Sequence, residues 1–279
     1  MKKISIITAI HNGLAFNRIF FDSLKKYTRH PFELIIIDNA STDGSTDFFR
    51  ENGARVIRNE ENYSYPYTQN QGIRAAGGEY LFFLNNDIIV SPDWDKLLIE
   101  IAGENGLDIL SAKGIENMGT LAGTRKFDRR WKRIKYPLLI GGINSRTLLF
   151  MARLMYGNWE KFCAGELARY GGQVIEGILG NNVMMTRRAL DILGFWDEGQ
   201  QAADFDLFMR AKKRSIEIGD IKPCHIALGV FIHHYIRMTS KYYRVKPLPF
   251  ADKDRLIPLA AKWTAEEREN YHPDNARGR

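Results

Sequence analysis

The sequence contains little cysteine and no long hydrophobic run. Two cysteines, Cys163 and Cys224, occur among its 279 residues, which is too few for a disulfide framework or a four-cysteine metal site. We therefore expect a protein of the reducing cytoplasm. The longest apolar runs, such as Leu34–Ile37, have the length of strands, whereas a membrane-spanning helix needs about 20 residues. The apolar stretch after Met1 ends at His11 without a small-residue cleavage site, so neither a leader peptide nor a transmembrane segment is expected.

Two glycine-rich nucleotide-binding motifs are also missing. A dinucleotide-binding fold carries Gly-x-Gly-x-x-Gly between its first strand and first helix, but Ala9–Ala15 contains Gly13 alone. The Gly-x-x-x-x-Gly-Lys-Ser/Thr phosphate loop occurs nowhere in the sequence. These absences argue against a nicotinamide dehydrogenase and against a P-loop nucleotidase.

The composition is that of an ordinary globular protein, and its basic charge is concentrated in one segment. Hydrophobic residues make up 44% and charged residues 26% of the chain, whose length suits one large α/β domain or two small ones. The net charge is +7, but Thr124–Lys135 contains seven Lys or Arg and one Asp, which leaves +1 for the other 267 residues. Such a segment binds nucleic acid, anionic lipid or a phosphorylated substrate, or forms a solvated helix face. The sequence contains no recognised RNA- or DNA-binding motif, so nucleic acid is not an expected partner.

Short β-rich runs alternate with helix-like stretches in the order of βαβ units. The runs are nearly continuous in hydrophobicity, which is typical of parallel strands buried on both faces. The expected strands are Lys3–Ile10, Phe32–Asp38, Ala54–Arg58, Glu79–Leu84 and Asp108–Ala112. The expected helices are Leu14–Tyr27, Ser45–Asn52, Tyr67–Ala76 and Trp94–Ala102.

Polar clusters follow three of these strands. His11–Gly13 ends the first strand, Asp38–Ser41 ends the second and Asn85–Asp87 ends the fourth. Ligands of open parallel sheets bind outside the carboxyl ends of the strands. One such cluster is an ordinary turn, but three together predict a ligand site at this edge of the sheet.

Two blocks of the sequence follow the pattern of a known family. The first contains LIIIDNASTDGS and ends on LNND, with matching positions at Leu34–Ser45, Asn62, Asn70, Gly72, Arg74, Gly78 and Leu84–Asp87. The second contains GFWDE and ADFDLFMRA, with matching positions at Gly180, Arg187, Arg188, Gly194–Glu198 and Ala203–Ala211. Together they resemble the family-2 glycosyltransferases of the GT-A fold, which transfer sugars from nucleotide donors. The resemblance implies an α/β fold with a Rossmann-like, mostly parallel central sheet flanked by helices.

The same resemblance divides the chain into four parts. Residues 1–115 are expected to form the nucleotide-sugar-binding half, 116–177 a helical and basic insertion, 178–240 the acceptor-side catalytic half of the same domain, and 241–279 a C-terminal extension. Arg146–Trp159 in the insertion looks amphipathic. Three interpretations of it remain open: a helix at an anionic membrane surface, a helix packed on the core of its own fold, and a dimer interface. The sequence predicts no oligomeric state.

The resemblance places a metal-binding carboxylate at Asp87. A carboxylate just beyond a buried strand is a hard oxygen ligand, which suits Mg²⁺ or Mn²⁺. Asn85 replaces the first Asp of the commoner family pattern, so we expect the divalent metal to depend largely on the phosphates of the donor. His234 and Thr239 match a histidine and a small hydroxyl residue of the family, and in some members this histidine completes the metal site. We expect His234 to be either a second metal ligand or a structural histidine.

Donor recognition is expected at the carboxyl ends of the first strands. By resemblance Asp38 recognises the base or the ribose, since a carboxylate accepts hydrogen bonds from imide N–H or hydroxyl groups. His11 either lines the same pocket or is an exposed loop histidine. The full expected set of donor-binding residues is Ala9, His11, Asp38, Asn70, Arg74, Asn86 and Asp87.

The expected general base is Asp204, which aligns with the second acidic residue of the family's Glu-Asp pair. Such a base takes the proton from the acceptor hydroxyl during attack on the anomeric carbon. Asp206 lies two positions further on, about 200° around a helix, and we expect it to fix the helix or to pair with Arg210. Ala203 occupies the family's Glu position, which implies a different acceptor or weakened activity.

These features predict an inverting, metal-dependent glycosyltransferase that acts by direct displacement. Its expected partners are a nucleotide-sugar donor and a glycan or lipid-linked acceptor. The basic segment predicts peripheral attachment to anionic lipid or to a lipid-linked phosphate acceptor, at the inner face of the membrane. The departures at Asn85 and Ala203 support an alternative, a catalytically silent nucleotide-sugar-binding protein.

Overall fold

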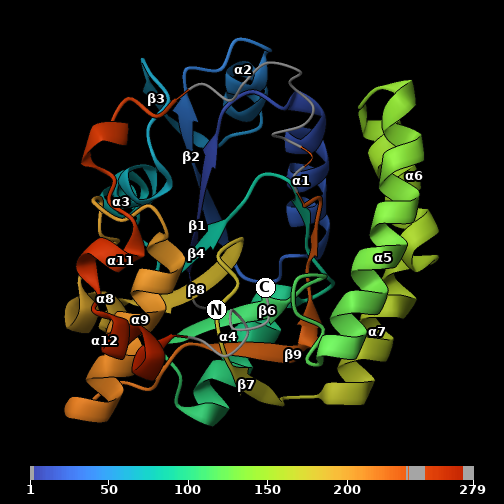
Figure 1. Cartoon of the computed structure of the whole chain (residues 1–279). Helices are drawn as coiled ribbons and strands as arrows, with labels where there is room; N and C mark the ends of the chain where they lie inside the picture. The colour runs from blue at the N-terminus through green and yellow to red at the C-terminus, as the bar shows by residue number, and fades with distance from the viewer. Residues whose placement is uncertain (1–2, 237, 239–248, 273–279) are drawn as a thin grey trace.

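The computed structural model describes residues 3–236, 238 and 249–272, and its centre is an eight-stranded sheet (Figure 1). The strand order is β3-β2-β1-β4-β8-β6-β9-β7, and all strands run parallel except β8 and β7. The expected α/β fold with a mostly parallel central sheet is therefore confirmed. The strands are β1 (Ile4–Ile10), β2 (Phe32–Asn39), β3 (Arg55–Asn59), β4 (Tyr80–Leu84), β6 (Ile109–Lys113), β7 (Val174–Glu176), β8 (Asn182–Thr186) and β9 (His225–Phe231), with a separate ribbon of β5 (Ile88–Ile89) and β10 (His233–His234).

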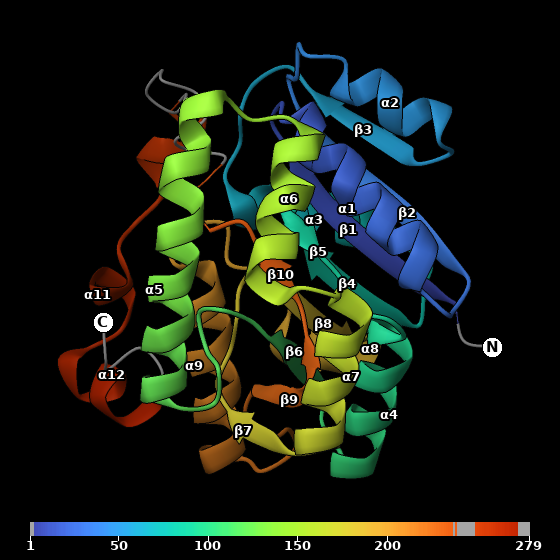
Figure 2. The same ribbon diagram turned by 90° about the vertical axis from the view of Figure 1, so that its right-hand side faces the viewer.

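Helices cover both faces of the sheet (Figure 1; Figure 2). The core on one face is formed with α1, α2 and α4, and the core on the other face with α3, α8 and α9. A third hydrophobic cluster joins α1 to α5 and α6. In the described part of the chain, no helix is both long and apolar enough to cross a membrane. The helices are α1 (Leu14–Tyr27), α2 (Ser45–Glu51), α3 (Tyr65–Ala75), α4 (Trp94–Asn105), α5 (Leu121–Leu138), η1 (Leu139–Gly141), α6 (Ser145–Tyr156), α7 (Trp159–Tyr170), α8 (Arg187–Leu193), α9 (Ala203–Glu217), η2 (Lys253–Arg255), α11 (Leu259–Lys262) and α12 (Ala265–Tyr271).

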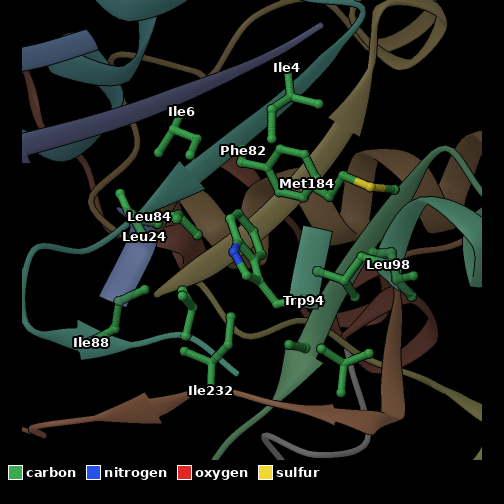
Figure 3. Packing of buried hydrophobic residues seen from close by; sticks show 14 of the residues in the cluster. Ile4, Ile6, Leu24, Phe82, Leu84, Ile88, Trp94, Leu98, Met184 and Ile232 are labelled. Carbon is green, nitrogen blue, oxygen red and sulfur yellow. The ribbon is translucent and has the colours of Figure 1, made fainter. Parts of the chain in front are cut away.

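Aromatic side chains pack between the sheet and α4 (Figure 3). The rings of Phe82 on β4 and Trp94 on α4 meet edge to face, with centroids 4.8 Å apart. Met184 of β8 lies beside them, and all three side chains are buried. Removing such a ring typically costs about 3–5 kcal/mol of folding free energy. This packing fixes β4 and β8, and therefore also the loops that follow β4 and precede β8.

The observed helix boundaries are close to the expected ones, with one informative difference. The helix Leu14–Tyr27 begins and ends where the pattern predicts. The third helix begins at Tyr65 rather than Tyr67, because Pro66 occupies its first turn. A proline there loses no hydrogen bond, and its fixed φ angle suits the start of a helix.

The segment expected to form a helical insertion contains α5, α6 and α7. On α6 the buried residues are Leu148, Met151 and Met155, at the spacing of a helix that packs along one stripe. They join Trp131 of α5 in a hydrophobic cluster that also includes residues of α1 and β9. The structure thus shows Arg146–Trp159 packed on the protein's own core, one of the three interpretations.

Residues 249–272 pack on α9 through a buried carboxylate. Asp206 accepts hydrogen bonds from Arg210 Nε over 2.8 Å, Lys262 Nζ over 2.6 Å and Trp263 Nε1 over 2.9 Å. The expected pairing of Asp206 with Arg210 is confirmed. The same carboxylate also anchors the described C-terminal segment, which the sequence pattern did not predict.

Candidate active site

One edge of the sheet gathers the polar loops of the chain. The carboxyl ends of β1, β2, β4, β6 and β9 lie at this edge, together with the amino end of the antiparallel β8. The first turn of α9 lies close to this edge of the sheet, because its Asp204 packs against Gly180, which precedes β8. The segments that meet here are His11–Gly13, Asp38–Ser41, Asn85–Asp87, Ile115–Glu116, Gly180–Asn181 and His233–His234.

The β5–β10 ribbon places His234 beside Asp87. His234 pairs with Ile88 in antiparallel register, and the backbone N–H of Tyr235 donates to the carbonyl oxygen of Asp87 over 2.9 Å. As a result, Nε2 of His234 lies 3.2 Å from Oδ1 of Asp87, and the two side chains are only 15% and 5% exposed. The two residues expected as metal ligands are therefore in direct contact, although they are 147 positions apart in the sequence.

Glu116, which follows β6, contacts the other nitrogen of the same ring. Its Oε1 lies within hydrogen-bond distance of Nδ1 of His234 and accepts a hydrogen bond from Nδ2 of Asn181 over 3.0 Å. Burial disfavours the charged form of the imidazole, but the negative charges of Asp87 and Glu116 outweigh burial and raise the pKa of His234 to about 10. In many metal sites a carboxylate holds one nitrogen of a histidine while the other nitrogen binds the metal. Glu116 occupies the position of that orienting carboxylate.

His233 points away from this pair. Its Nδ1 lies 2.8 Å from the hydroxyl of Tyr156, and its ring meets Trp131 edge to face with centroids 5.0 Å apart. Burial, with a smaller contribution from the neighbouring His234, lowers the pKa of His233 to about 3, so this ring is neutral. Because successive side chains of a strand face opposite sides, only His234 faces Asp87. Thr239, the expected hydroxyl companion of His234, lies outside the described residues.

Asp87 and His234 fit a divalent metal ion that takes its other ligands from a bound molecule. A carboxylate oxygen suits Mg²⁺ or Mn²⁺, and neutral imidazole is a common metal ligand. Within the described ranges, no group of three or more His, Cys, Asp or Glu side chains could hold a metal ion by itself. Asp87 and Glu116 contact opposite nitrogens of His234 and so do not converge on one point. Two protein ligands leave coordination positions for phosphate oxygens or water.

Asp204, in the first turn of α9, packs directly against Gly180. A Cβ atom on Gly180 would lie 2.4 Å from Oδ2 and 2.9 Å from Cβ of Asp204, so a side chain at position 180 would displace the carboxylate. The hydroxyl of Tyr65 donates to the carbonyl oxygen of Gly180 over 3.3 Å. Burial, with the charge of Asp204, raises the pKa of Tyr65 and keeps this hydroxyl protonated. Asp204 is half-buried while Asp206 is fully buried, so the two carboxylates occupy different faces of α9, as their spacing predicts.

A cavity of about 650 Å³ connects Asp204 with His234. The strand-edge residues Asn85, Glu116 and Asn181 line it, and one wall is formed by α5. This arrangement places part of the basic segment at the candidate active site, which the sequence pattern did not indicate. The residues of α5 that line the cavity are Thr124, Arg125, Asp128, Trp131, Lys132, Lys135 and Tyr136.

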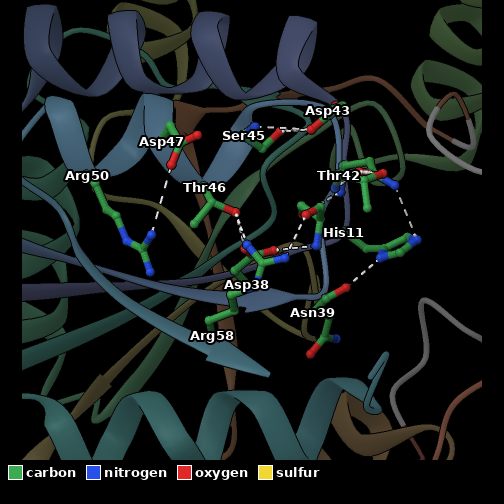
Figure 4. Close-up of polar contacts among 12 residues, drawn as sticks. His11, Asp38, Asn39, Thr42, Asp43, Ser45, Thr46, Asp47, Arg50 and Arg58 are labelled. Atoms are coloured by element: carbon green, nitrogen blue, oxygen red, sulfur yellow. Dashed lines mark hydrogen bonds and ion pairs between the residues drawn. The ribbon is translucent and has the colours of Figure 1, made fainter. Parts of the chain in front are cut away.

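The expected base-recognition residues lie outside this cavity, at the carboxyl ends of β1 and β2 (Figure 4). Asp38 is fully buried; its Oδ1 accepts a hydrogen bond from the backbone N–H of Ser41 over 3.0 Å, and Thr46 donates to its Oδ2. Nδ1 of His11 lies 2.6 Å from the carbonyl oxygen of Asn39. Both side chains thus shape the two loops. Ala9 is half-buried on β1, opposite Ile37 of β2.

A short polar network joins these loops to the one after β4. Nδ2 of Asn86 donates to Oδ1 of Asn17 over 2.7 Å, and Nδ2 of Asn17 donates to Oγ of Ser45 over 2.8 Å. Asn17 is completely buried on α1. The network fixes Asn86 next to Asp87 and links the expected donor-binding loops to the expected metal ligands.

Asn70 and Arg74, the other expected donor-binding residues, lie on α3 away from the cavity. Nδ2 of Asn70 donates to the carbonyl oxygen of Trp196 and to Oε1 of Glu198, each over 2.8 Å, and Oδ1 accepts from the backbone N–H of Trp196 over 3.0 Å. Arg74 contacts the same Glu198 at 3.5 Å and lies over the ring of Phe195. These contacts hold the GFWDE segment against α3. Since α3 ends just before β4 begins, Arg74 lies toward the opposite edge of the sheet.

Comparison with known proteins identifies the family of this chain. The family model of glycosyl transferase family 2 matches residues 5–171, more than half of the chain. The chain belongs to this glycosyltransferase family. The match begins in β1 and extends through α7, so it includes the α5 wall of the cavity as well as Asp87 and Glu116.

Several curated proteins and one solved structure are similar to parts of this family-2 chain. EpsH of Bacillus subtilis is 31% identical over 106 residues, which are 36% of this chain and 30% of EpsH. The O-antigen biosynthesis protein RfbC of Myxococcus xanthus is 31% identical over 137 residues, which are 45% of this chain and 11% of RfbC. The chain thus spans less than a third of either relative. The mannosyltransferase PcManGT from Pyrobaculum calidifontis, solved in complex with GDP-Man and Mn²⁺, gives a TM-score of 0.49 at 16% identity and covers 81% of this chain and 57% of that chain.

Two residues of the candidate site in this family-2 chain were missed by the sequence analysis. Glu116 follows β6 at the same edge as the three recognised clusters, so its position after an expected strand was a usable signal. Asn181 precedes β8, and nothing in its local sequence indicates that the strand runs antiparallel and brings its amino end to the site. Asn85, a departure from the family pattern, lines the cavity and donates its backbone N–H to the carbonyl oxygen of Asn181 over 3.0 Å.

Proposed function

We propose that this family-2 chain transfers a sugar from a nucleotide-diphosphate donor to an acceptor hydroxyl, with inversion at the anomeric carbon. The observation that carries the proposal is the cavity that joins Asp204 to His234 and, through it, to Asp87. One end offers a carboxylate suited to accept a proton, and the other offers two ligands for a divalent metal ion. A metal-assisted glycosyl transfer uses both functions at neighbouring positions.

In the proposed reaction the acceptor oxygen forms a bond to the anomeric carbon while the bond from that carbon to the donor phosphate breaks. The nucleoside diphosphate leaves with the electron pair of the broken bond, and the acceptor proton passes to the carboxylate of Asp204. Attack from the face opposite the leaving group inverts the configuration. Gly180 supports this step by leaving room for the carboxylate, which packs against it.

Asp87 and His234 would hold a divalent metal ion, Mg²⁺ or Mn²⁺, together with phosphate oxygens of the donor. When bound, such an ion stabilises the negative charge that develops on a leaving diphosphate. Glu116 orients His234, and Asn181 in turn holds Glu116. The proposed donor contacts at the carboxyl ends of β1, β2 and β4 are those of Ala9, His11, Asp38 and Asn86.

The acceptor is proposed to be a glycan or a lipid-linked glycan, reached from an anionic membrane surface. The support is the exposure of basic and apolar side chains on α5, η1 and α6; Figure 2 shows α5 and α6 together on the side of the molecule that faces the viewer. Ile140 is 90% exposed and Phe150 is 49% exposed, and Arg129 and Arg133 are exposed on α5 without lining the cavity. Basic side chains near an anionic surface contribute about 1 kcal/mol each to binding.

A thermal-shift screen of nucleotide sugars, with and without Mn²⁺, tests the proposed function. A ligand present at 100 times its dissociation constant stabilises the folded state by about 2.7 kcal/mol. A stabilising donor is then incubated with metal and candidate acceptors, and release of the nucleoside diphosphate is measured. Metal-dependent stabilisation followed by release supports the transferase. Tight donor binding without any release would instead identify the catalytically silent nucleotide-sugar-binding protein.

A further inference from the structure

The α5 helix carries basic residues that line the cavity and basic residues that do not. Arg125, Lys132 and Lys135 line the cavity that contains Asp204, and their spacing of seven and three residues puts them on one side of a helix. Arg129 and Arg133 are also exposed on α5 but do not line the cavity. The basic residues of α5 therefore divide into those that line the cavity of the candidate active site and those that are exposed without lining it.

The three cations that line the cavity differ in the contacts they already make with the protein. Nζ of Lys132 lies 2.7 Å from Oδ2 of Asp128, and the two side chains form an exposed ion pair between adjacent turns of the helix. The amine of Lys135 is buried and donates to the carbonyl oxygen of Ile236 over 3.1 Å. Arg125 has no ion-pair or hydrogen-bond partner among the residues that the structure describes, and it is exposed. Arg125 is therefore the cation of this wall most available to a ligand, with Lys132 held nearby in a weak surface pair.

These cations lie on the acceptor side of the proposed reaction. The cavity lining includes Asp204 and the adjoining Phe205 but none of the residues after β1 and β2 that are proposed to bind the nucleotide. Figure 1 shows α5 and α9 on the two sides of the sheet edge, so a molecule in the cavity lies between them. Trp131, Tyr136 and Phe205 add aromatic surface to the lining, which suits a sugar ring or a hydrocarbon chain.

We propose that Arg125 and Lys132 bind a negatively charged group of the acceptor, a phosphate or a carboxylate, while its hydroxyl faces Asp204. A guanidinium recognises both groups through paired N–H donors, and an ammonium adds a point charge. The positive wall also offsets the carboxylates of Glu116, Asp128 and Asp204, which otherwise repel an anion. This inference rests on the proposed transferase function and narrows its acceptor to an anionic class.

The test compares binding of four probes by isothermal titration calorimetry at one ionic strength, without donor. Butyl glucoside is paired with butyl glucosyl phosphate, and methyl glucoside with methyl glucuronide. We expect at least one charged probe to bind about tenfold more tightly than its neutral partner, the effect of one charge-assisted hydrogen bond. Preference for the phosphate indicates a lipid-linked source, and preference for the glucuronide indicates an acidic glycan.

The variant Arg125→Gln/Lys132→Gln should lose this preference. Arg129→Gln/Arg133→Gln removes the same charge from exposed positions of the same helix that do not line the cavity, and it should keep the preference. Equal affinity for charged and neutral probes in the wild-type protein, or no binding of either charged probe, overturns the proposal. So does an equal loss of preference in both double variants, because net charge would then be responsible. Failure of the transferase proposal is detected separately, as the absence of any nucleotide sugar that stabilises the protein.

Discussion

Gly180 and Asp204 are packed so tightly that the glycine determines where the carboxylate lies. A Cβ atom at position 180 would approach within 2.4 Å of Oδ2 and 2.9 Å of both Cβ and Cγ of Asp204. The Cβ of Asp204 is fixed to the backbone of α9, so rotation of the side chain cannot relieve the overlap. A residue 24 positions away in the sequence thus sets the position of the proposed base.

The variant Gly180→Ala should therefore lose transfer activity while retaining its fold. We expect a loss of about 100-fold, the cost of a misplacement of roughly 1 Å at a reacting group, with donor binding close to wild type. Gly165→Ala is the matched control, because a Cβ at this position in α7 meets no atom within 4 Å. The control should retain full activity. Wild-type turnover in Gly180→Ala would contradict the positioning of Asp204 by Gly180.

Replacing Asp204 by Asn preserves the shape of the side chain and removes its ability to accept the acceptor proton. We expect nucleoside diphosphate release to fall by about 10²–10⁴-fold, the usual contribution of a general base, while metal-dependent donor binding stays near wild type. Both are measured on the same preparation, with the donor found in the thermal-shift screen. Near-wild-type transfer with a verified acceptor would show that another group is the base.

Asp206→Asn is the informative control for this variant. Asp206 is buried and accepts hydrogen bonds from Arg210, Lys262 and Trp263, so its loss should act on stability. We expect a lowered melting temperature, with transfer by the remaining folded protein changed far less than in Asp204→Asn. The two carboxylates are two residues apart, and their different effects would follow from the two helix faces they occupy.

The proposed metal ligands, Asp87 and His234, give a third prediction, which concerns the affinity for donor and metal rather than turnover. Asp87→Ala should abolish the Mn²⁺-dependent part of donor binding in the thermal-shift assay without unfolding the protein. Glu116→Gln should weaken Mn²⁺ affinity by about 10–100-fold, the usual effect of removing a carboxylate that orients a ligating histidine. Glu166→Gln is not a suitable control, because Glu166 pairs with the buried Lys113. Glu160→Gln, which alters an exposed pair with Lys26, should leave Mn²⁺ affinity unchanged.

The sequence predicted the parallel half of the fold well, because each strand there carries its own signal. Phe32–Asn39 and Tyr80–Leu84 are short apolar runs followed by polar turns, and the helices between them repeat their apolar residues at helical spacing. The family pattern also named Asp87, which the structure places after β4, and Asp204, which lines the cavity. It named His234 but left open whether this residue is a metal ligand or a structural histidine, because the direction of its side chain depends on the register of a two-residue ribbon.

The basic segment shows why the remaining parts of the site could not be read from the sequence. Its charges indicate an anionic partner, but they lie all around α5, from Arg125 to Lys135. Only the packing of Trp131 into the cluster with α6 determines which cations face the cavity. Asn181 is similar, because its role depends on the antiparallel direction of β8. Both are consequences of tertiary packing between segments far apart in the chain.

Lys113 and Glu166 form a buried ion pair that allows a test of the fold itself. The Lys113 side chain is fully buried and that of Glu166 is 14% exposed, and the amine also lies 3.8 Å from the centroid of the Tyr170 ring. Removing one partner of such a pair leaves a buried charge and costs about 3–5 kcal/mol. We expect Glu166→Gln to lower the free energy of urea unfolding by roughly this amount. Glu160→Gln on the same helix, an exposed residue, should change it little.

The exposed basic and apolar side chains of α5, η1 and α6 give the last prediction, on binding to anionic vesicles. Arg129 and Arg133 of α5 are exposed, as are the apolar Ile140 and Phe150, and each cation near an anionic surface contributes about 1 kcal/mol. Arg129→Gln/Arg133→Gln should therefore reduce co-sedimentation with phosphatidylserine vesicles at low salt by at least about tenfold, since 1.4 kcal/mol is a factor of ten in affinity. Arg125→Gln/Lys132→Gln removes the same charge from the cavity wall and should reduce it less. Added salt should weaken binding of the wild type, because exposed charges are screened. Co-sedimentation unaffected by Arg129→Gln/Arg133→Gln would remove the support for peripheral attachment, while the anionic acceptor site would stand on its own test.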